Sequence, residues 1–336
     1  MILIDILKAF ASQIIVLHHL AFYSPMSDTI REFAPVAFEW LSRDARIAVQ
    51  VFLVAGGYLA ARALAPSGYL VGASPLDALK KRYLKLVVPY AAALAFAVIC
   101  AAFARLLMAH DSIPAPPTIL QAIAHLLLLQ GILKVDSLSA GVWYVAIDFQ
   151  LFALFLGMLV VAKNAGKKNA CALATLSVAA GILASLFYFN RNASFNDWSL
   201  YFFGAYGFGI LAFYISQSGR KAPGLAFLAL STLLALGIDF RSRIALAGIT
   251  ALALCVPERW RFPENRRDVR LLRRLGEISY GVFLTHFPII LAVGAIVTHF
   301  FPGNAVANIA GIFIAWIISI GSGFALHRLI SLLNSR

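Results

Sequence analysis

Long apolar segments separated by short polar loops are the feature that most constrains how this chain can fold. A bilayer offers backbone N–H and C=O groups no water, so a crossing segment must satisfy its hydrogen bonds internally, as a helix of about 20 residues does. Of all residues 61% are hydrophobic and 13% charged, whereas a soluble domain carries about 25% charged residues. The pattern predicts an all-α polytopic membrane protein. We expect ten transmembrane helices, at about 3–23, 46–64, 84–107, 142–162, 170–189, 198–215, 223–238, 242–256, 277–300 and 306–328.

A further apolar run, at about 119–133, follows Pro114, Pro116 and Pro117 and is too short to span comfortably. It predicts a re-entrant or interfacial helix. With ten spans and a cytoplasmic N-terminus, most lysines and arginines fall in cytoplasmic loops, including the basic stretches at 80–85 and 259–274. The positive-inside rule therefore places both termini in the cytoplasm. Membrane topology accounts for the net charge of +13, so no nucleic-acid partner is expected.

One integral-membrane domain is predicted over residues 1–336, because no repeat, low-complexity tract or linker divides the chain. Asp5 and the His18–His19 pair fit a cleaved signal peptide poorly, so the first run is expected to remain as a helix. Three cysteines lie far apart, in or at the edge of apolar segments, and are interpreted as small core residues. The histidines are scattered without ligand spacing, so no metal is implied.

Ionisable residues inside the first apolar run mark a candidate functional site, because such groups are costly at membrane depth. Asp5, Lys8, Ser12, Gln13 and His19 lie close to one helical face, and Asp5 can pair with Lys8 three residues later. A neutral imidazole near the external side can act as general base toward a hydroxyl group. The alternative interpretation is a lysine that extends its amine to the interface and a histidine that lies there.

The run WYVAIDFQLF in the fourth long segment carries a second buried charge, Asp148. At about 1.5 Å per residue, Asp148 and His19 are predicted to lie at similar depths below the external surface. A carboxylate that orients a histidine and stabilises its protonated form is familiar from acyl transfer. In the alternative, Asp148 pairs with an arginine.

Three other motifs allow two interpretations each. Arg82 and Lys85 lie three residues apart, so one helical face could meet the phosphates of an anionic cofactor, although basic cytoplasmic loops are expected from topology alone. Gly56 and Gly57 predict either close helix packing or a passage lined by backbone. His286, in EISYGVFLTHFPI, is either a structural hydrogen-bonding residue or part of a polar channel.

Taken in order, these segments resemble the acyltransferase 3 family of integral-membrane O-acyltransferases. The family's first helix carries Asp-x-x-Arg followed after ten residues by His, and Lys8 stands here in place of that arginine. Later blocks have Asp148 where the family has Glu, Lys85 where it has Arg, and Gly56 where it has Ser. The matching residues, within about 5–290, are Asp5, Lys8 and His19; Gly56, Gly57 and Tyr58; Arg82, Lys85, Pro89 and Tyr90; Trp143, Tyr144, Val145 and Asp148; Ser279, Tyr280, Gly281, Phe283 and His286.

The resemblance implies transfer of an acyl group, usually acetyl, from cytoplasmic acyl-CoA to a sugar hydroxyl of a cell-surface or lipid-linked glycan. It implies a multi-pass protein of the bacterial inner membrane, with membrane lipid and the glycan as partners. His19 would be the general base or a transient acyl carrier, with Asp148 as its orienting carboxylate. The remaining implied roles are binding CoA phosphates or positioning the thioester (Lys8, Arg82 and Lys85), holding Lys8 (Asp5), and shaping the passage or acceptor site (Trp143, Tyr144, Tyr280 and His286).

Other functional classes remain open at this level. A transporter or flippase of a glycan or lipid intermediate would explain the polar stripe, although paired half-chain repeats are absent from the sequence. A glycosyltransferase that uses a lipid-linked sugar is expected to show an acidic pair in the first external loop, where only scattered acidic residues occur. A catalytically inactive interaction protein is the third alternative. The sequence leaves the oligomeric state undetermined.

Overall fold

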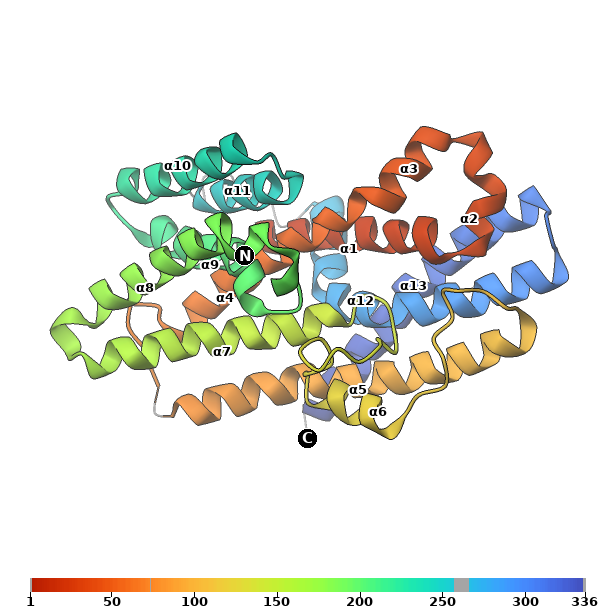
Figure 1. The fold of residues 1–336 in the computed structure, drawn as a ribbon, viewed down its shortest axis with the longest axis horizontal. Coiled ribbons are helices and arrows are strands. Elements are labelled where there is room, and N and C mark those ends of the chain that lie inside the picture. The colour runs from red at the N-terminus through yellow and green to blue at the C-terminus, as the bar shows by residue number, and fades with distance from the viewer. Residues whose placement is uncertain (1, 73, 257–265, 335–336) are drawn as a thin grey trace. The chain divides into compact units, whose positions relative to one another are not determined.

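The computed structural model describes residues 2–72, 74–256 and 266–334, and all regular elements in these ranges are helices (Figure 1). The all-α prediction is therefore confirmed for this part of the chain. Arg259, Arg261 and Arg336, which contribute to the predicted topology, lie outside the described residues. Eight helices within the described ranges are long and apolar enough to cross a membrane. They correspond to α1 (Ile2–Tyr23), α4 (Val49–Leu64), α5 (Pro75–Leu107), α7 (Trp143–Asn164), α8 (Lys167–Phe187), α9 (Ser199–Gln217), α12 (Arg267–Phe300) and α13 (Ala305–Asn334).

The two other predicted spans form the shorter helices α10 (Ala222–Ile238) and α11 (Ser242–Cys255). They have 17 and 14 residues, which corresponds to about 25 and 21 Å of helix, less than the roughly 30 Å hydrocarbon core of a typical bilayer. Both are helical and apolar as expected, but neither has the length of the other eight. The total of ten spans and the cytoplasmic location of both ends stay predictions.

The predicted short helix at 119–133 is present only in part, as α6 (Ile119–Leu126). Thr118 begins it with a capping box: its hydroxyl accepts from the Gln121 backbone N–H, while the Gln121 side chain accepts from the Thr118 N–H. After Leu126 the chain turns irregularly as far as Trp143. The re-entrant or interfacial position of this segment stays a prediction.

Short helices connect α1 to α4, where the sequence analysis assigned only a loop. They are α2 (Pro25–Ile30), the 3-10 helix η1 (Arg31–Phe33), α3 (Pro35–Arg43) and the 3-10 helix η2 (Ala45–Ala48). The Ser24 hydroxyl caps α2 by accepting from the Met26 N–H, and Pro25 occupies the first helical position, where its missing N–H costs nothing.

The chain forms two compact units, each assembled from segments that are distant in sequence. Unit 1 comprises Met1–Ile4, Val49–Lys85 and Tyr144–Arg266; unit 2 comprises Asp5–Ala48, Leu86–Trp143 and Arg267–Arg336. The sequence did not indicate this division, and one membrane domain over 1–336 stays a prediction.

In unit 1, glycines bring the backbones of α4 and α9 into contact. A Cβ on Gly57 would collide with the carbonyl oxygen of Tyr206, and one on Gly209 would collide with the carbonyl oxygen of Val54. Only glycine permits this approach. For Gly57, the close-packing interpretation of the glycine pair is therefore confirmed.

In unit 2, α12 lies along α13 (Figure 1), and a Cβ on Gly281 would collide with the backbone of Gly323. A hydrophobic core joins α1, α2, α12 and α13, with Val16, Met26 and Ile290 fully or almost fully buried. α12 packs against α13 and against the core shared with α1 and α2, and this packing fixes the face of α12 that carries His286. His286 is itself completely buried.

Candidate functional site

Two buried polar clusters, one in each unit, contain four of the ten residues predicted to act. In unit 2, His19 from α1 meets His286 from α12, with His19 Nδ1 2.5 Å from His286 Nε2. The two ring planes differ by 13° and their centroids are 4.8 Å apart. Because the nitrogens are much closer than the centroids, the rings meet edge to edge, in the geometry of an N–H···N hydrogen bond.

The direction of this hydrogen bond follows from the next contact. His286 Nδ1 lies 3.0 Å from the carbonyl oxygen of Val282, which can only accept, so Nδ1 carries the proton. A neutral His286 therefore accepts at Nε2, and His19 donates from Nδ1. His19 then has its free lone pair on Nε2, the nitrogen that a general base requires.

Aromatic rings and one glycine enclose His19. Tyr23 and Phe287 meet its ring edge-on, with centroids 5.2 and 6.5 Å away. Gly141, at φ +80°, lies so close that an added Cβ would be 3.4 Å from His19 Cε1 and 3.3 Å from Phe283 Cζ. Gly141 thus combines a left-handed backbone with a close approach to the imidazole. Sequence reasoning missed it, although a glycine directly before the VWY motif was a possible signal.

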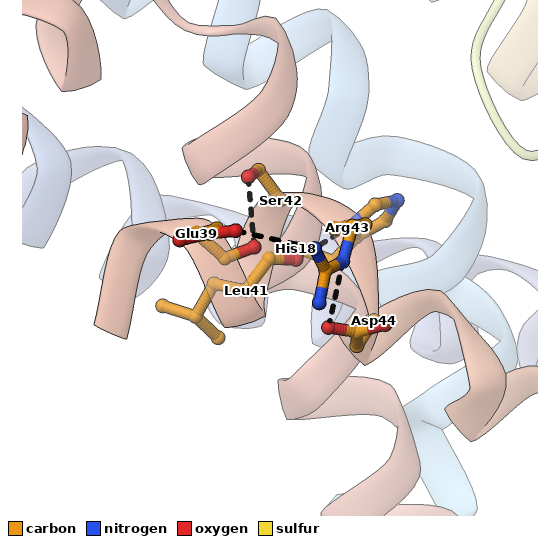
Figure 2. A network of polar contacts seen from close by, with 6 residues as sticks. All are labelled: His18, Glu39, Leu41, Ser42, Arg43 and Asp44. Atoms are coloured by element: carbon orange, nitrogen blue, oxygen red, sulfur yellow. Dashed lines mark hydrogen bonds and ion pairs between the residues drawn. The ribbon is translucent and has the colours of Figure 1, made fainter. Parts of the chain in front are cut away.

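The neighbouring histidine has a different partner. His18 Nδ1 donates to the backbone carbonyl of Leu41 at 2.7 Å, which ties α3 to α1 (Figure 2). On α3, Arg43 pairs with Glu39 and with Asp44, each at 3.2 Å. These ion pairs are largely exposed, so they contribute little. His18 is thus a connection to the segment after α1, and His19 alone of the two belongs to the histidine pair.

The second cluster lies in unit 1, where Arg82 of α5 pairs with Asp148 of α7 at 2.5 Å. The Asp148 side chain is 5% exposed and the Arg82 side chain 24%, and the guanidinium also lies over the Phe152 ring, 5.4 Å from its centroid. This is the alternative arrangement for Asp148, in which an arginine is its partner. The role of Asp148 in orienting His19 stays a prediction, because the two residues belong to different units.

Tyr206 of α9 completes this cluster and was not predicted. Its side chain is fully buried, and its hydroxyl lacks a hydrogen-bond partner among the described residues, as does Arg82 Nε. A Cβ on Gly56 would lie 3.4 Å from both the Tyr206 ring and Asp148 Oδ1. In the run YFFGAYGFG, Tyr206 looks like one packing aromatic among several, so the sequence carried no signal for it.

The polar stripe on α1 is partly satisfied within unit 2. Lys8 Nζ lies 3.5 Å from Asp5 Oδ1, which confirms their predicted pairing. Ser12 donates to the Ala9 carbonyl, and Gln13 accepts from the Trp316 indole N–H at 2.8 Å. Polar residues of this stripe are therefore already hydrogen-bonded or ion-paired to other groups of the protein.

The remaining predicted residues lie in varied surroundings. The Lys85 side chain is exposed, and Trp143 is 38% exposed. Tyr144 is buried against Phe52, with centroids 6.1 Å apart. The Tyr280 hydroxyl donates to the Leu86 carbonyl at 3.1 Å. The structure thus gives Tyr280 a defined structural contact, and the roles assigned to these residues in substrate passage stay predictions.

Among the residues that the structure describes, no group of three or more His, Cys, Asp or Glu side chains could hold a metal ion. Unit 2 offers a hydrogen-bonded pair of buried imidazoles. Unit 1 offers an ion pair and two hydrogen-bond donors that have no partner in the described part of the chain.

Comparison with known proteins gives one family match. The family model described as an acyltransferase domain, acyltransferase 3, matches residues 1–328. No curated protein and no solved structure gives a significant match to the chain.

Proposed function

The chain belongs to the acyltransferase 3 family, and from this premise we propose that it transfers an acyl group, acetyl in the simplest case, from cytoplasmic acyl-CoA to a glycan hydroxyl. The acceptor would be a cell-surface or lipid-linked glycan, and the location the inner membrane of a bacterium. The eight long apolar helices and the family support a multi-pass membrane acyltransferase. The donor, acceptor and membrane are the finer parts of the proposal.

The observation that carries the mechanism is the tautomer of His19. Its Nδ1–H is donated to His286, whose own proton is held by the Val282 carbonyl, so His19 Nε2 is the free basic nitrogen. In the proposed reaction, Nε2 takes the proton of the acceptor hydroxyl while that oxygen attacks the thioester carbonyl carbon. The C–S bond then breaks, the CoA sulfur receives the proton from His19, and the products are an ester and the free thiol.

His286 acts through His19. Once His19 is protonated, its Nδ1–H remains hydrogen-bonded to the His286 Nε2 lone pair, which holds the ring in position as the third member of a catalytic triad does, but without that member's negative charge. A metal ion has no part in this scheme.

On the donor side, Lys8 and Lys85 are proposed to meet CoA phosphates, with Asp5 holding Lys8. Arg82 is proposed to position the thioester, since its Nη2 is already taken up by Asp148. Trp143, Tyr144 and Tyr280 are proposed to shape the path to the acceptor. Lipid and glycan are the expected partners.

The test is the amount of alkali-labile ester on the surface glycans of the host. Cells with the intact protein, a deletion, His19→Ala and His18→Ala are compared at matched expression, and the released acid identifies the acyl group. We expect ester to be lost in the deletion and in His19→Ala, because a general base contributes about 10²- to 10⁴-fold. His18→Ala is the matched control, since the His18 Nδ1–H is donated to the Leu41 carbonyl and takes no part in the hydrogen bond between His19 and His286.

Each of the other outcomes contradicts one part of the proposed function. Unchanged ester in the deletion contradicts glycan acylation by this protein. Ester lost in the deletion but retained in His19→Ala keeps the activity and removes His19 from it. Glycan export that fails in the deletion while no ester is ever detected favours a transporter or flippase.

A further inference from the structure

Tyr206 and Arg82 place two unsatisfied hydrogen-bond donors in the core of unit 1. The Tyr206 side chain is fully buried, and neither its hydroxyl nor Arg82 Nε has a partner among the described residues. Buried polar groups in native proteins are almost always paired, because an unpaired one retains the full cost of its desolvation. Two such groups beside one buried ion pair point to a ligand that supplies the missing acceptor.

The packing around Tyr206 holds it in place. Its backbone carbonyl abuts Gly57 of α4, so α9 cannot shift away without opening the contact between α4 and α9. Gly56, one residue earlier, leaves the space between the Tyr206 ring and Asp148 Oδ1 without a side chain. The hydroxyl is therefore presented by a rigid scaffold.

Charge restricts the ligand that can bind there. Asp148 neutralises Arg82 at 2.5 Å, so the cluster has no net formal charge. A phosphate group would bring negative charge beside the Asp148 carboxylate, which is unfavourable in surroundings of low dielectric. A neutral oxygen acceptor, by contrast, brings no charge to the cluster and leaves the ion pair intact.

We propose that Tyr206 Oη and Arg82 Nε bind the thioester carbonyl oxygen of the acyl donor. This inference rests on the proposed function, because it takes acyl-CoA as the donor. The contact forms no covalent bond: it holds the acyl end of the donor within unit 1. Tyr206 thereby distinguishes the acyl thioester from CoA derivatives that lack this oxygen.

The experiment measures binding of two probes that differ at the carbonyl group. Full-length protein in lipid nanodiscs is titrated with acetyl-CoA and with S-ethyl-CoA, a thioether of similar size without the oxygen. Wild type is compared with Tyr206→Phe and with Tyr214→Phe. The latter is the matched control on the same helix, because the Tyr214 hydroxyl donates to the Ala65 carbonyl at 3.0 Å.

We expect wild type to prefer acetyl-CoA and Tyr206→Phe to lose about tenfold in affinity for it, the effect of one hydrogen bond. Binding of S-ethyl-CoA should be unchanged, and so should the preference of Tyr214→Phe. The thermal midpoint of Tyr206→Phe should be equal to or higher than that of wild type, because the variant removes an unpaired buried hydroxyl.

The unfavourable outcomes are distinct. If Tyr206→Phe binds acetyl-CoA as wild type does, or loses both probes equally with a lower thermal midpoint, the inference is overturned and the proposed function stands. If wild type binds neither probe, acyl-CoA is not the donor, and both proposals fall.

Discussion

His19 and His286, 267 residues apart in sequence, share one hydrogen bond of 2.5 Å between fully or almost fully buried rings. Because the Val282 carbonyl fixes the proton on His286, this bond sets the tautomer of His19. The relationship makes His286 a positioning residue of the proposed reaction.

Removing His286 should therefore lower the turnover number more than it changes substrate binding. We expect His286→Ala to reduce kcat by about a hundredfold, less than His19→Ala, with little change in the KM for the donor. His286→Gln should recover part of kcat, since its amide oxygen can accept from His19 Nδ1. Steady-state kinetics of the reconstituted protein separate the two parameters. Equal kcat values for His286→Ala and wild type would contradict the positioning role.

Gly56 and Gly57 should differ sharply in their tolerance of a methyl group. Gly57→Ala places its Cβ against the Tyr206 backbone carbonyl, which cannot move aside, so α4 and α9 must separate. A loss of about 1–3 kcal/mol is the usual result of overpacking, and a backbone clash lies at the upper end. Gly56→Ala meets ordinary contacts at 3.4 Å and serves as the adjacent control. Thermal unfolding in detergent makes the comparison; equal midpoints would be inconsistent with this packing.

Removing one member of the Arg82–Asp148 pair should destabilise the protein more than replacing both members with apolar residues. Arg82→Ala leaves the Asp148 carboxylate buried without its partner, and we expect a loss of about 3 kcal/mol, reduced by the 24% exposure of Arg82. The double variant Arg82→Met, Asp148→Leu removes both charges and should regain most of this stability. Chemical unfolding of the three proteins tests the prediction. A double variant no more stable than Arg82→Ala would show that the charge pair is not the cause.

Acid should loosen the segment that follows α6. Burial lowers the pKa of His125 below its usual value of 6.5, and the hydrogen bond to the Gln121 carbonyl opposes this shift to a smaller extent. Neutral His125 donates from Nδ1 to Gln121 and accepts at Nε2 from the Leu138 N–H at 3.2 Å. Protonation of His125 would convert Nε2 from an acceptor into a second N–H donor, which would face the Leu138 N–H.

Since the folded-state pKa is the lower one, the open segment binds more protons than the closed one. The stabilisation is complete above about pH 6.5 and is lost as the pH falls below that value. Hydrogen exchange at the Leu138 amide should therefore show falling protection between about pH 6.5 and 5, after correction for the intrinsic exchange rate. His125→Gln, which can donate and accept without titrating, should remove this dependence. A wild-type profile parallel to that of His125→Gln would refute the prediction.

Local patterns in the sequence predict a contact correctly where both partners lie on one helix. Asp5 pairs with Lys8 because the two lie one turn apart on α1, and that contact needs no knowledge of other helices. The depth argument for Asp148 had a different limit: counting residues from the surface gives a position along the membrane normal but says nothing of which helices are neighbours. The Arg82–Asp148 contact depends on which helices are neighbours. So does the position of Tyr206 beside it, which was not predicted.

By itself, the sequence determined that this protein is an assembly of apolar helices, because long, predominantly apolar runs can satisfy their backbone groups in lipid only within a helix. It also determined which few side chains would be costly there, and hence candidates for function. Tertiary structure alone decided their partners: His286 for His19, Leu41 for His18, and Arg82 for Asp148. The reason is physical, since each of these contacts joins two different helices, and the periodicity of one segment does not determine which helices lie beside it.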